Sequence, residues 1–313
     1  MRVVVLGLVC LAVGCGSSES SGSATGGSSS GGAATGGTSS GGAAGVSGGG
    51  SSTGGASGSG GSVGGGFPDA TNTGIPEGAC PNGLVAATLT ETEPASGKVI
   101  ECYRFDGAVP YIRPEIKNVT YRYCRFETKD DTFLNLQGGP VTIEDSEFTG
   151  PAGTWIRTAY DANDLSVRRC NFSGMANAIE FGTTNVVIED NYVHDFGNVT
   201  QDQHADGFQT EGADSFTISH NTVLFNEVWG STSALLLKAG AKSQVKDNLL
   251  AGGGYTIHVS GDLDFVGNRV STKFHPDSGI YGPVYPESLA PSGVWQDNAW
   301  HDGPKAGQPI AAP

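Results

Sequence analysis

The sequence predicts an all-β fold, a right-handed parallel β-helix with caps at both ends. Two observations favour it: a strand–turn–strand unit recurs seven times, and asparagine dominates one position of that unit. A third is the absence of any long segment with helical periodicity, which argues against a helical solenoid and against alternating strands and helices.

The repeated unit is a short strand with alternating apolar residues, a small turn residue, and then a further apolar residue. Successive turn positions are 20 to 30 residues apart. A coil of three short strands and three turns needs about that length, so each unit is expected to mark one coil. The seven turn positions are Cys124, Ser146, Cys170, Asn191, Asn221, Asn248 and Asn268.

Asparagine suits such a column for two reasons. It tolerates the left-handed backbone conformation that a sharp bend requires, and stacked asparagines can form hydrogen bonds from coil to coil. The column resembles the asparagine ladder of the pectate-lyase-like β-helix superfamily over roughly residues 102–270. The resemblance implies the fold and leaves the chemistry open, because many activities share this scaffold.

The first 15 residues are expected to be an export signal, with Arg2, an apolar run from Val3 to Val13, and Gly14 before Cys15. Residues 12–15 resemble the lipobox of bacterial lipoproteins. This resemblance implies acylation of Cys15 and a lipid anchor at the outer membrane or cell surface. The alternative is ordinary cleavage after Gly14, which would leave a free cysteine.

Residues 16–66 are almost entirely Gly, Ser, Ala and Thr, with Glu19 as the only charge. Such a segment cannot bury enough surface to offset its conformational entropy, so it is expected to be a disordered tether. The β-helix domain is therefore expected over residues 67–313. The repeat fades after Val270, and the Pro- and aromatic-rich sequence from about residue 271 is expected to be a C-terminal cap.

The net charge of −15 argues against nucleic acid as a partner. It also disfavours a polyanionic sugar unless local cations or bound Ca²⁺ reverse the field. The domain is expected to be a monomer.

Four cysteines lie beyond the signal. Cys124 and Cys170 would lie two coils apart, about 9–10 Å, which exceeds disulfide range, so both are expected to be buried thiols. Cys80 and Cys102 either pair, clamping the N-terminal cap onto the first coil, or remain thiols.

The candidate site lies where the coils are longest. The interval from Asn191 to Asn221 is 30 residues long, and insertions in solenoids often mark the working face. It holds Asp202, His204, Asp206 and Gln209 in the segment Asp-Gln-His-Ala-Asp-Gly-Phe-Gln. We expect Asp202, His204 and Gln209 to contact substrate beside Asp206.

Counting back ten residues from successive ladder asparagines gives Glu211, Lys238 and His258. Because adjacent coils stack about 4.8 Å apart, these three are expected to form one outward column beside Asp206. Counting back twelve predicts a second column, Gln209, Leu236 and Thr256. The alternative is an ordinary solvated salt bridge with an exposed histidine.

Residues 204–207, His-Ala-Asp-Gly, resemble the Asn-Thr-Asp-Gly segment of polygalacturonase-type glycosidases, which implies that Asp206 is a catalytic carboxylate. The Asp-Asp, Gly-His-Gly and Arg-Ile-Lys motifs of those enzymes are absent here. Asp202 or Glu211 would then supply the second carboxylate that hydrolysis needs.

For a lyase, Lys238 would neutralise a uronate and His258 would act as base. A Ca²⁺ ion held by Asp202, Asp206 and Glu211 is a further candidate, although no dedicated calcium loop is visible.

The sequence therefore favours a cell-surface lipoprotein acting on polysaccharide, as a lyase or a glycoside hydrolase. The alternative is a non-catalytic carbohydrate-binding or adhesive surface protein. An enzyme needs an ionisable cluster in a groove, and the single cluster near Asp206 and Lys238 favours the first interpretation.

Overall fold

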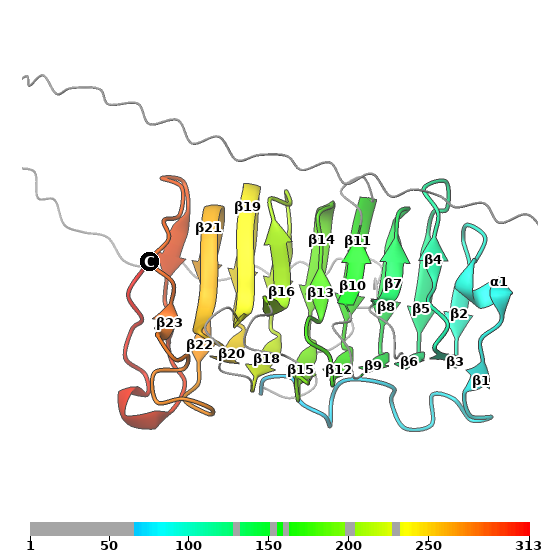
Figure 1. Ribbon diagram of the computed structural model, residues 1–313, viewed down its shortest axis with the longest axis horizontal. Helices are drawn as coiled ribbons and strands as arrows, with labels where there is room; N and C mark the ends of the chain where they lie inside the picture. The colour runs from blue at the N-terminus through cyan, green and yellow to red at the C-terminus, as the bar shows by residue number, and fades with distance from the viewer. Residues whose placement is uncertain (1–65, 128–131, 151–154, 159–162, 198–203, 227–231) are drawn as a thin grey trace, which may run out of the picture. The chain divides into compact units, whose positions relative to one another are not determined.

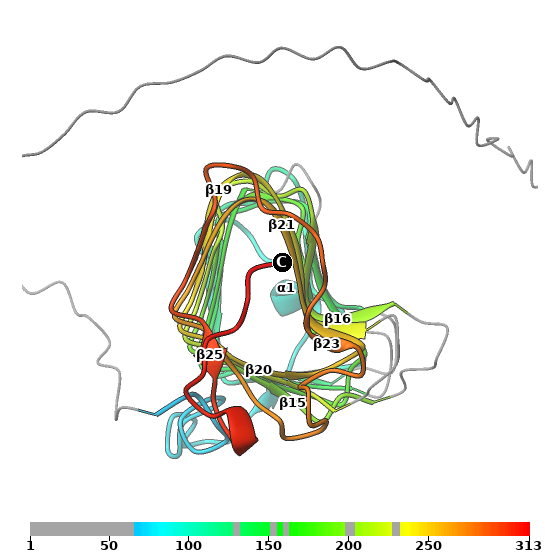
Figure 2. The same ribbon diagram turned by 90° about the vertical axis from the view of Figure 1, so that its left-hand side faces the viewer.

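The computed structural model describes residues 66–127, 132–150, 155–158, 163–197, 204–226 and 232–313. These residues form a parallel β-helix, and every pairing between its named strands is parallel. Figure 1 shows the coils stacked side by side along one axis. In Figure 2, which looks along that axis, the coils superpose in a three-sided outline. The predicted fold class is confirmed.

The first of the three faces is a ten-stranded sheet. Its strands follow the turn positions of the repeat. In order they are β1 (Val85–Ala86), β3 (Tyr103–Asp106), β6 (Arg125–Glu127), β9 (Glu147–Thr149), β12 (Asn171–Ser173), β15 (Tyr192–His194), β18 (Thr222–Phe225), β20 (Leu249–Gly252), β22 (Arg269–Val270) and β25 (Ala299–Trp300).

The other two faces join into one sheet because the long strands β19 (Thr232–Lys246) and β21 (Tyr255–Val266) bend from one face to the next. The second face holds the later parts of β19 and β21 together with β2 (Val99–Glu101), β5 (Val119–Arg122), β8 (Val141–Glu144), β11 (Asn163–Arg168), β14 (Thr184–Glu189), β17 (Thr217–Ser219) and β24 (Val294–Gln296).

The third face, which carries the site, holds the first parts of β19 and β21. Its other strands are β4 (Tyr111–Ile112), β7 (Thr132–Leu136), β10 (Trp155–Thr158), β13 (Ile179–Glu180), β16 (Ala205–Glu211) and β23 (Gly282–Val284).

The interior is filled by inward side chains at alternate strand positions. On the first face, Phe105, Phe126, Phe148 and Phe172 are fully buried and stack along the axis. Their ring centroids are 4.7, 4.6 and 4.5 Å apart in succession. These separations match the spacing between neighbouring strands, so the same inward position is filled by the same side chain in four coils.

The asparagine ladder runs through the interior at one corner. The backbone N–H of Asn191 donates to Oδ1 of Asn221 at 2.9 Å, and that of Asn221 donates to Asn248 at 2.9 Å. The ladder extends one coil further than expected, because the N–H of Asn268 donates to Oδ1 of Asn298 at 2.9 Å. The segment after Val270 is thus partly another coil rather than a cap alone.

The prediction that the ladder asparagine itself adopts the left-handed conformation is wrong. The left-handed residue is the one before each ladder position, as at Asp190, His220 and Asp247, whose φ angles are 58°, 51° and 57°. The ladder residue itself does not have a positive φ. Asparagine is therefore favoured in this column for its coil-to-coil hydrogen bonds.

Both ends of the solenoid are covered. At the N-terminal end lies α1 (Leu89–Thr92), whose capping box is formed by Thr88 and Glu91. At the other end, the chain after η1 (Gly303–Lys305) returns so that Ile310 is buried and its N–H donates to the Asn298 carbonyl at 2.9 Å. These segments cover core that would otherwise face water. In the described part of the chain, no helix is long and apolar enough to cross a membrane.

The segment before the first coil lies along the outside of the helix, drawn in blue along one edge of Figure 1. Phe67 lies 6.0 Å from His220 and 5.5 Å from His301, ring centroid to centroid, and Gly74 donates to the Arg169 carbonyl at 2.8 Å. The segment ends at Cys80, which forms a disulfide with Cys102. Residues 67–80 therefore form a strap across several coils.

Cys124 and Cys170 are free and buried, at two ladder positions. Burial raises the pKa of the Cys124 thiol to about 12 and also raises that of Cys170. Both are therefore protonated and unreactive in the folded protein.

Candidate functional site

A groove of about 330 Å³ opens on the third face near the C-terminal end, and we call it the Asp206 groove. Its lining comes from β16, β19, β21 and the chain following β23. Figure 2 shows β16 and β23 at the same corner of the coils. The residues that line it are His204, Asp206, Thr232, Ser233, Leu236, Lys238, His258, Tyr285 and Glu287.

A break in the inward–outward alternation of β16 places Asp206 in this groove. Strict alternation would place Asp206 on the same side as Phe208, which is fully buried in the core. The alternation shifts at Gly207, where an added Cβ would lie 2.4 Å from both the Ala234 carbonyl oxygen and a Val223 methyl group. Gly207 and Phe208 therefore both face inward, and Asp206 faces the groove.

Asp206 is 1% exposed and lies at the base of the groove. The Ser233 hydroxyl, from the neighbouring coil, donates a hydrogen bond to its Oδ1. The backbone N–H of Asp206 donates to Oδ1 of Asn177 at 2.8 Å. The other carboxyl oxygen, Oδ2, is buried and has no hydrogen-bond partner among the described residues. A buried polar atom without a partner is costly, so Oδ2 is a candidate for hydrogen bonding to a ligand in the groove.

The surroundings of Asp206 favour its protonated form. Burial raises the pKa of Asp206 to about 7, and the charge of Glu211 acts in the same direction. The hydrogen bonds from Ser233 oppose this shift. A carboxyl group with this pKa can give up and regain a proton near neutral pH, as a general acid must.

Lys238 is paired with Glu211. Their strands align these two residues directly, and Nζ of Lys238 lies 2.8 Å from a carboxylate oxygen of Glu211. The hydrogen bond to Glu211 raises the pKa of Lys238, so this amine stays charged. Both side chains are nearly half exposed, so the ion pair contributes little to stability.

The predicted column of three residues is wrong at His258. In the structure Lys238 aligns with Ser260, whereas His258 aligns with Leu236 and therefore with Gln209. Thr256, expected to face outward beside Leu236, is buried. The turn of β19 between Ala239 and Ser243 is two residues longer than its counterpart in β21, so counting back from the asparagines loses register.

His258 still lines the same groove, two positions from the expected one. Its ring stacks on that of Tyr285, with centroids 4.4 Å apart and planes 8° apart. Burial, followed by the charges of Lys238 and His204, lowers the pKa of His258 to about 4. The imidazole is therefore uncharged at neutral pH and can donate or accept a hydrogen bond.

Of the residues predicted to contact substrate, His204 lines the groove and Gln209 does not. His204 is exposed at the rim of the groove. Gln209 is not part of the lining, and its Oε1 accepts a hydrogen bond from Nδ2 of Asn177 at 3.2 Å. It thereby orients the amide that holds the Asp206 backbone. Asp202 and Cys15 lie outside the described residues.

No group of three or more metal-ligating side chains occurs within the described ranges. A Ca²⁺ site that includes Asp202 stays a prediction, since that residue is not described.

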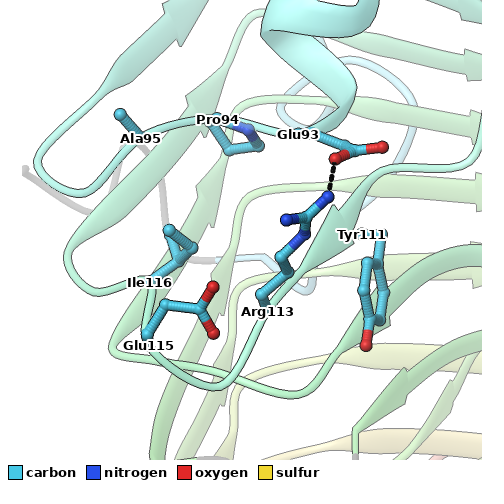
Figure 3. A pocket seen from close by; sticks show the side chains of 7 residues that line it. All are labelled: Glu93, Pro94, Ala95, Tyr111, Arg113, Glu115 and Ile116. Atoms are coloured by element: carbon cyan, nitrogen blue, oxygen red, sulfur yellow. Dashed lines mark hydrogen bonds and ion pairs between the residues drawn. The ribbon is translucent and has the colours of Figure 1, made fainter.

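A second groove, of about 220 Å³, lies near the N-terminal end and is shown in Figure 3. There Arg113 is paired with Glu93, with Tyr111 beside them. Arg113, Glu93 and Tyr111 are all exposed. The residues that line this groove therefore include no buried acid comparable to Asp206.

Sequence reasoning missed five residues around Asp206, one of which is Thr232 in the groove lining. Ser233 and Asn177 hold the carboxyl group and backbone of Asp206, and Tyr285 and Glu287 form one wall. Tyr285 and Glu287 lie in the segment that was expected only to cap the solenoid. The sequence could have indicated Ser233, because it lies near the start of the strand that pairs with the strand carrying Asp206.

The fold and the groove define a parallel β-helix protein with a buried acidic residue in a surface groove. The family described as a right handed beta helix region matches residues 112–270, about half of the chain. The chain therefore belongs to the right-handed β-helix family, and its fold is that of the pectate-lyase-like proteins. Comparison with curated proteins and with solved structures gave no match.

Proposed function

We propose that the protein cleaves a polysaccharide in the Asp206 groove, with Asp206 as the proton donor. The fold is compatible with a polysaccharide-related function. The observation that carries the proposal is the carboxyl group of Asp206, which is buried at the base of an open groove with Oδ2 unpartnered among the described residues.

The other groups suit this role. Ser233 fixes one oxygen of Asp206, so the proton is carried on the other oxygen, Oδ2. His258 is uncharged and can hold a sugar hydroxyl, and Glu287 supplies a second carboxylate in the same groove. Cleavage of a glycosidic bond needs an acid at the leaving oxygen and a second group that activates water or removes a proton.

A screen of the full chain on a panel of polysaccharides tests the proposal. New reducing ends would report either mode of cleavage, and absorbance of unsaturated products would report elimination alone. Asp206→Asn should reduce the rate by roughly 100-fold or more, since a general acid contributes about that much. Asp214→Asn, a change on the same coil outside the groove, should leave the rate unchanged. Equal rates for parent and Asp206→Asn would refute the proposal.

The second candidate is binding without cleavage. It is favoured by the aromatic side chains next to the groove, where Tyr255, Tyr281 and Tyr285 lie close together. This function would be supported instead by a glycan that binds to the parent protein and is not shortened on incubation with it.

We also propose that the chain is exported and anchored through an acylated Cys15, with residues 16–66 as the tether. The proposal depends on the sequence of the first 66 residues. Cys15→Ser should release the protein from membranes into the soluble fraction. Continued membrane association of that variant would contradict the anchor.

A further inference from the structure

We propose that the Asp206 groove selects glycans without carboxylate groups and binds them against a platform of tyrosines. This inference deepens the proposed function by naming its substrate class, and it rests on that function for the cleavage step. Two sets of observations carry it: the charges that line the groove and the aromatic cluster at its end.

The charges in the groove disfavour an anionic sugar. Lys238 is the one lysine or arginine among the described lining residues, and its charge is matched by Glu211 at 2.8 Å. Glu287 lies close enough to Lys238 to act on it as well. Asp206 adds a further carboxyl group at the base. A uronate placed here would meet carboxylates without a free cation to neutralise it.

The histidines do not change this balance. His258 is uncharged at neutral pH because burial and the nearby Lys238 lower its pKa. His204 lies at the exposed rim. Recognition of a carboxylate is usually made by a charged fork or a point cation that is free to pair. The groove presents hydrogen-bonding groups instead, which suit hydroxyl groups.

The aromatic cluster supplies the contact area. Tyr255 lies 5.4 Å from Tyr281 and 5.3 Å from Tyr285, measured between ring centroids. Tyr285 also stacks on His258 inside the groove. Tyr281 is 60% exposed and Tyr285 is 39% exposed, so large apolar faces remain open to solvent. Exposed aromatic faces that adjoin a polar groove fit the apolar face of a sugar ring.

The mode of cleavage follows from the substrate class. Elimination removes a proton that a neighbouring carboxylate makes acidic, so it needs a uronate. A glycan without carboxylates would be hydrolysed. Asp206 would give its proton to the leaving oxygen as the C1–O bond breaks, and the oxygen of water would bond to C1. The proton that water loses would pass to the Glu287 carboxylate and then to solvent, and Asp206 would regain a proton from solvent before the next turnover.

Matched pairs of polymers test the substrate class: polygalacturonate and alginate, each beside its carboxyl-reduced form. Binding is measured by affinity electrophoresis with full-length Asp206→Asn, so that cleavage does not interfere. The reduced polymer of a pair should bind roughly tenfold more tightly, the effect of one repelled charge at this range. Glu287→Gln should reduce the difference in affinity between the two polymers of a pair, because it removes one of the repelling carboxylates.

Tyr281→Ala should weaken binding of the reduced polymer roughly tenfold. The control is Tyr111→Ala, which removes another exposed tyrosine, in the second groove, and should not change binding.

The outcomes separate the two proposals. Tighter binding of the carboxylate polymers, with cleavage that Asp206→Asn abolishes, would overturn the substrate class and leave the proposed function standing. The expected binding order, with cleavage that Asp206→Asn leaves unchanged, would overturn the proposed function and support the substrate class. Absence of binding to all four polymers would overturn both.

Discussion

The hydroxyl of Ser233 donates a hydrogen bond to Oδ1 of Asp206 from the neighbouring coil. The two residues are aligned directly across the β16–β19 pairing. The bond holds one carboxyl oxygen and leaves Oδ2, which has no partner among the described residues, as the atom that can carry a proton. It also lowers the pKa of a carboxyl group that burial raises to about 7. This pair therefore sets the pH range in which Asp206 can act as an acid.

Activity should fall as pH rises above about 7. The reason is that a general acid must be protonated, and Asp206 loses its proton in that range. The expected decline in kcat/KM is roughly tenfold per pH unit on the alkaline side, measured on the best glycan of the panel. A profile that stays level to pH 9 would contradict the assignment.

Ser233→Ala should move the alkaline limb of that profile to higher pH. The hydrogen bond from Ser233 lowers the pKa of Asp206, so its removal raises the pKa further. Ser260→Ala is the matched control, because Ser260 lies beside Lys238 but outside the groove lining. A limb that moves to lower pH in Ser233→Ala would show that the bond acts in the opposite sense.

Asp206→Asn should change how stability depends on pH. An aspartate has a pKa near 3.8 when unfolded and about 7 here, so between these values the folded state binds the extra proton. The parent therefore loses stability as pH rises from about 4 to about 7, by up to roughly 4 kcal/mol, and the variant does not.

Urea unfolding of both proteins at pH 5 and pH 8 measures this difference. His258, with a folded pKa of about 4, gives the opposite slope between about pH 4 and 6.5. It is present in both proteins and cancels on subtraction. If the free energies of unfolding of parent and variant change in parallel with pH, the raised pKa of Asp206 in the folded protein is contradicted.

Asn221→Ala should lower the free energy of unfolding by about 2–3 kcal/mol or more. Asn221 is fully buried, and its Nδ2 donates to the carbonyls of Ile188 and Ser219. Its Oδ1 also accepts from the backbone and side chain of Asn191, whose donors would be left unpaired. Asn82→Ala, at an exposed turn, is the control and should melt with the parent. Equal melts for both variants would contradict the ladder.

Reduction of the disulfide should lower the melting temperature. Cys80 and Cys102 close a loop with a sequence separation of 22, for which chain entropy implies about 3 kcal/mol. The double variant Cys80→Ser, Cys102→Ser should melt like the reduced parent and should not respond to a reducing agent. A parent melt that is insensitive to reduction would show that the strap is not clamped by this bond.

Much of the fold could be predicted from the sequence because each coil of the repeat places similar residue types at equivalent positions. The residues at positions such as Asn221 and Asn248 are chosen by hydrogen bonds that recur from coil to coil between Asn191 and Asn298. Asn298 escaped notice because a Pro- and aromatic-rich stretch separates it from Asn268. The left-handed residues also escaped notice, because they vary in type, as Asp190 and His220 show.

The site could be predicted only in part. Lys238 and Glu211 are aligned as expected, because both lie ten residues before their asparagines. His258 is displaced by the two extra residues in the turn of β19, a length difference that no local pattern reveals. The burial of Asp206 depends on the corner at Gly207, where two consecutive residues face inward. Tertiary packing therefore decides its pKa.

The leaving-group dependence of Asp206→Asn tests the central claim most directly. The rate of the variant relative to the parent is measured on the glycan and on a dinitrophenyl glycoside of the same sugar, whose leaving group needs no proton. If Asp206 is the proton donor, the variant loses about 100-fold or more on the glycan and only a small factor on the aryl glycoside. An equal loss on both substrates, or no loss on either, would contradict the assignment of Asp206 as the acid.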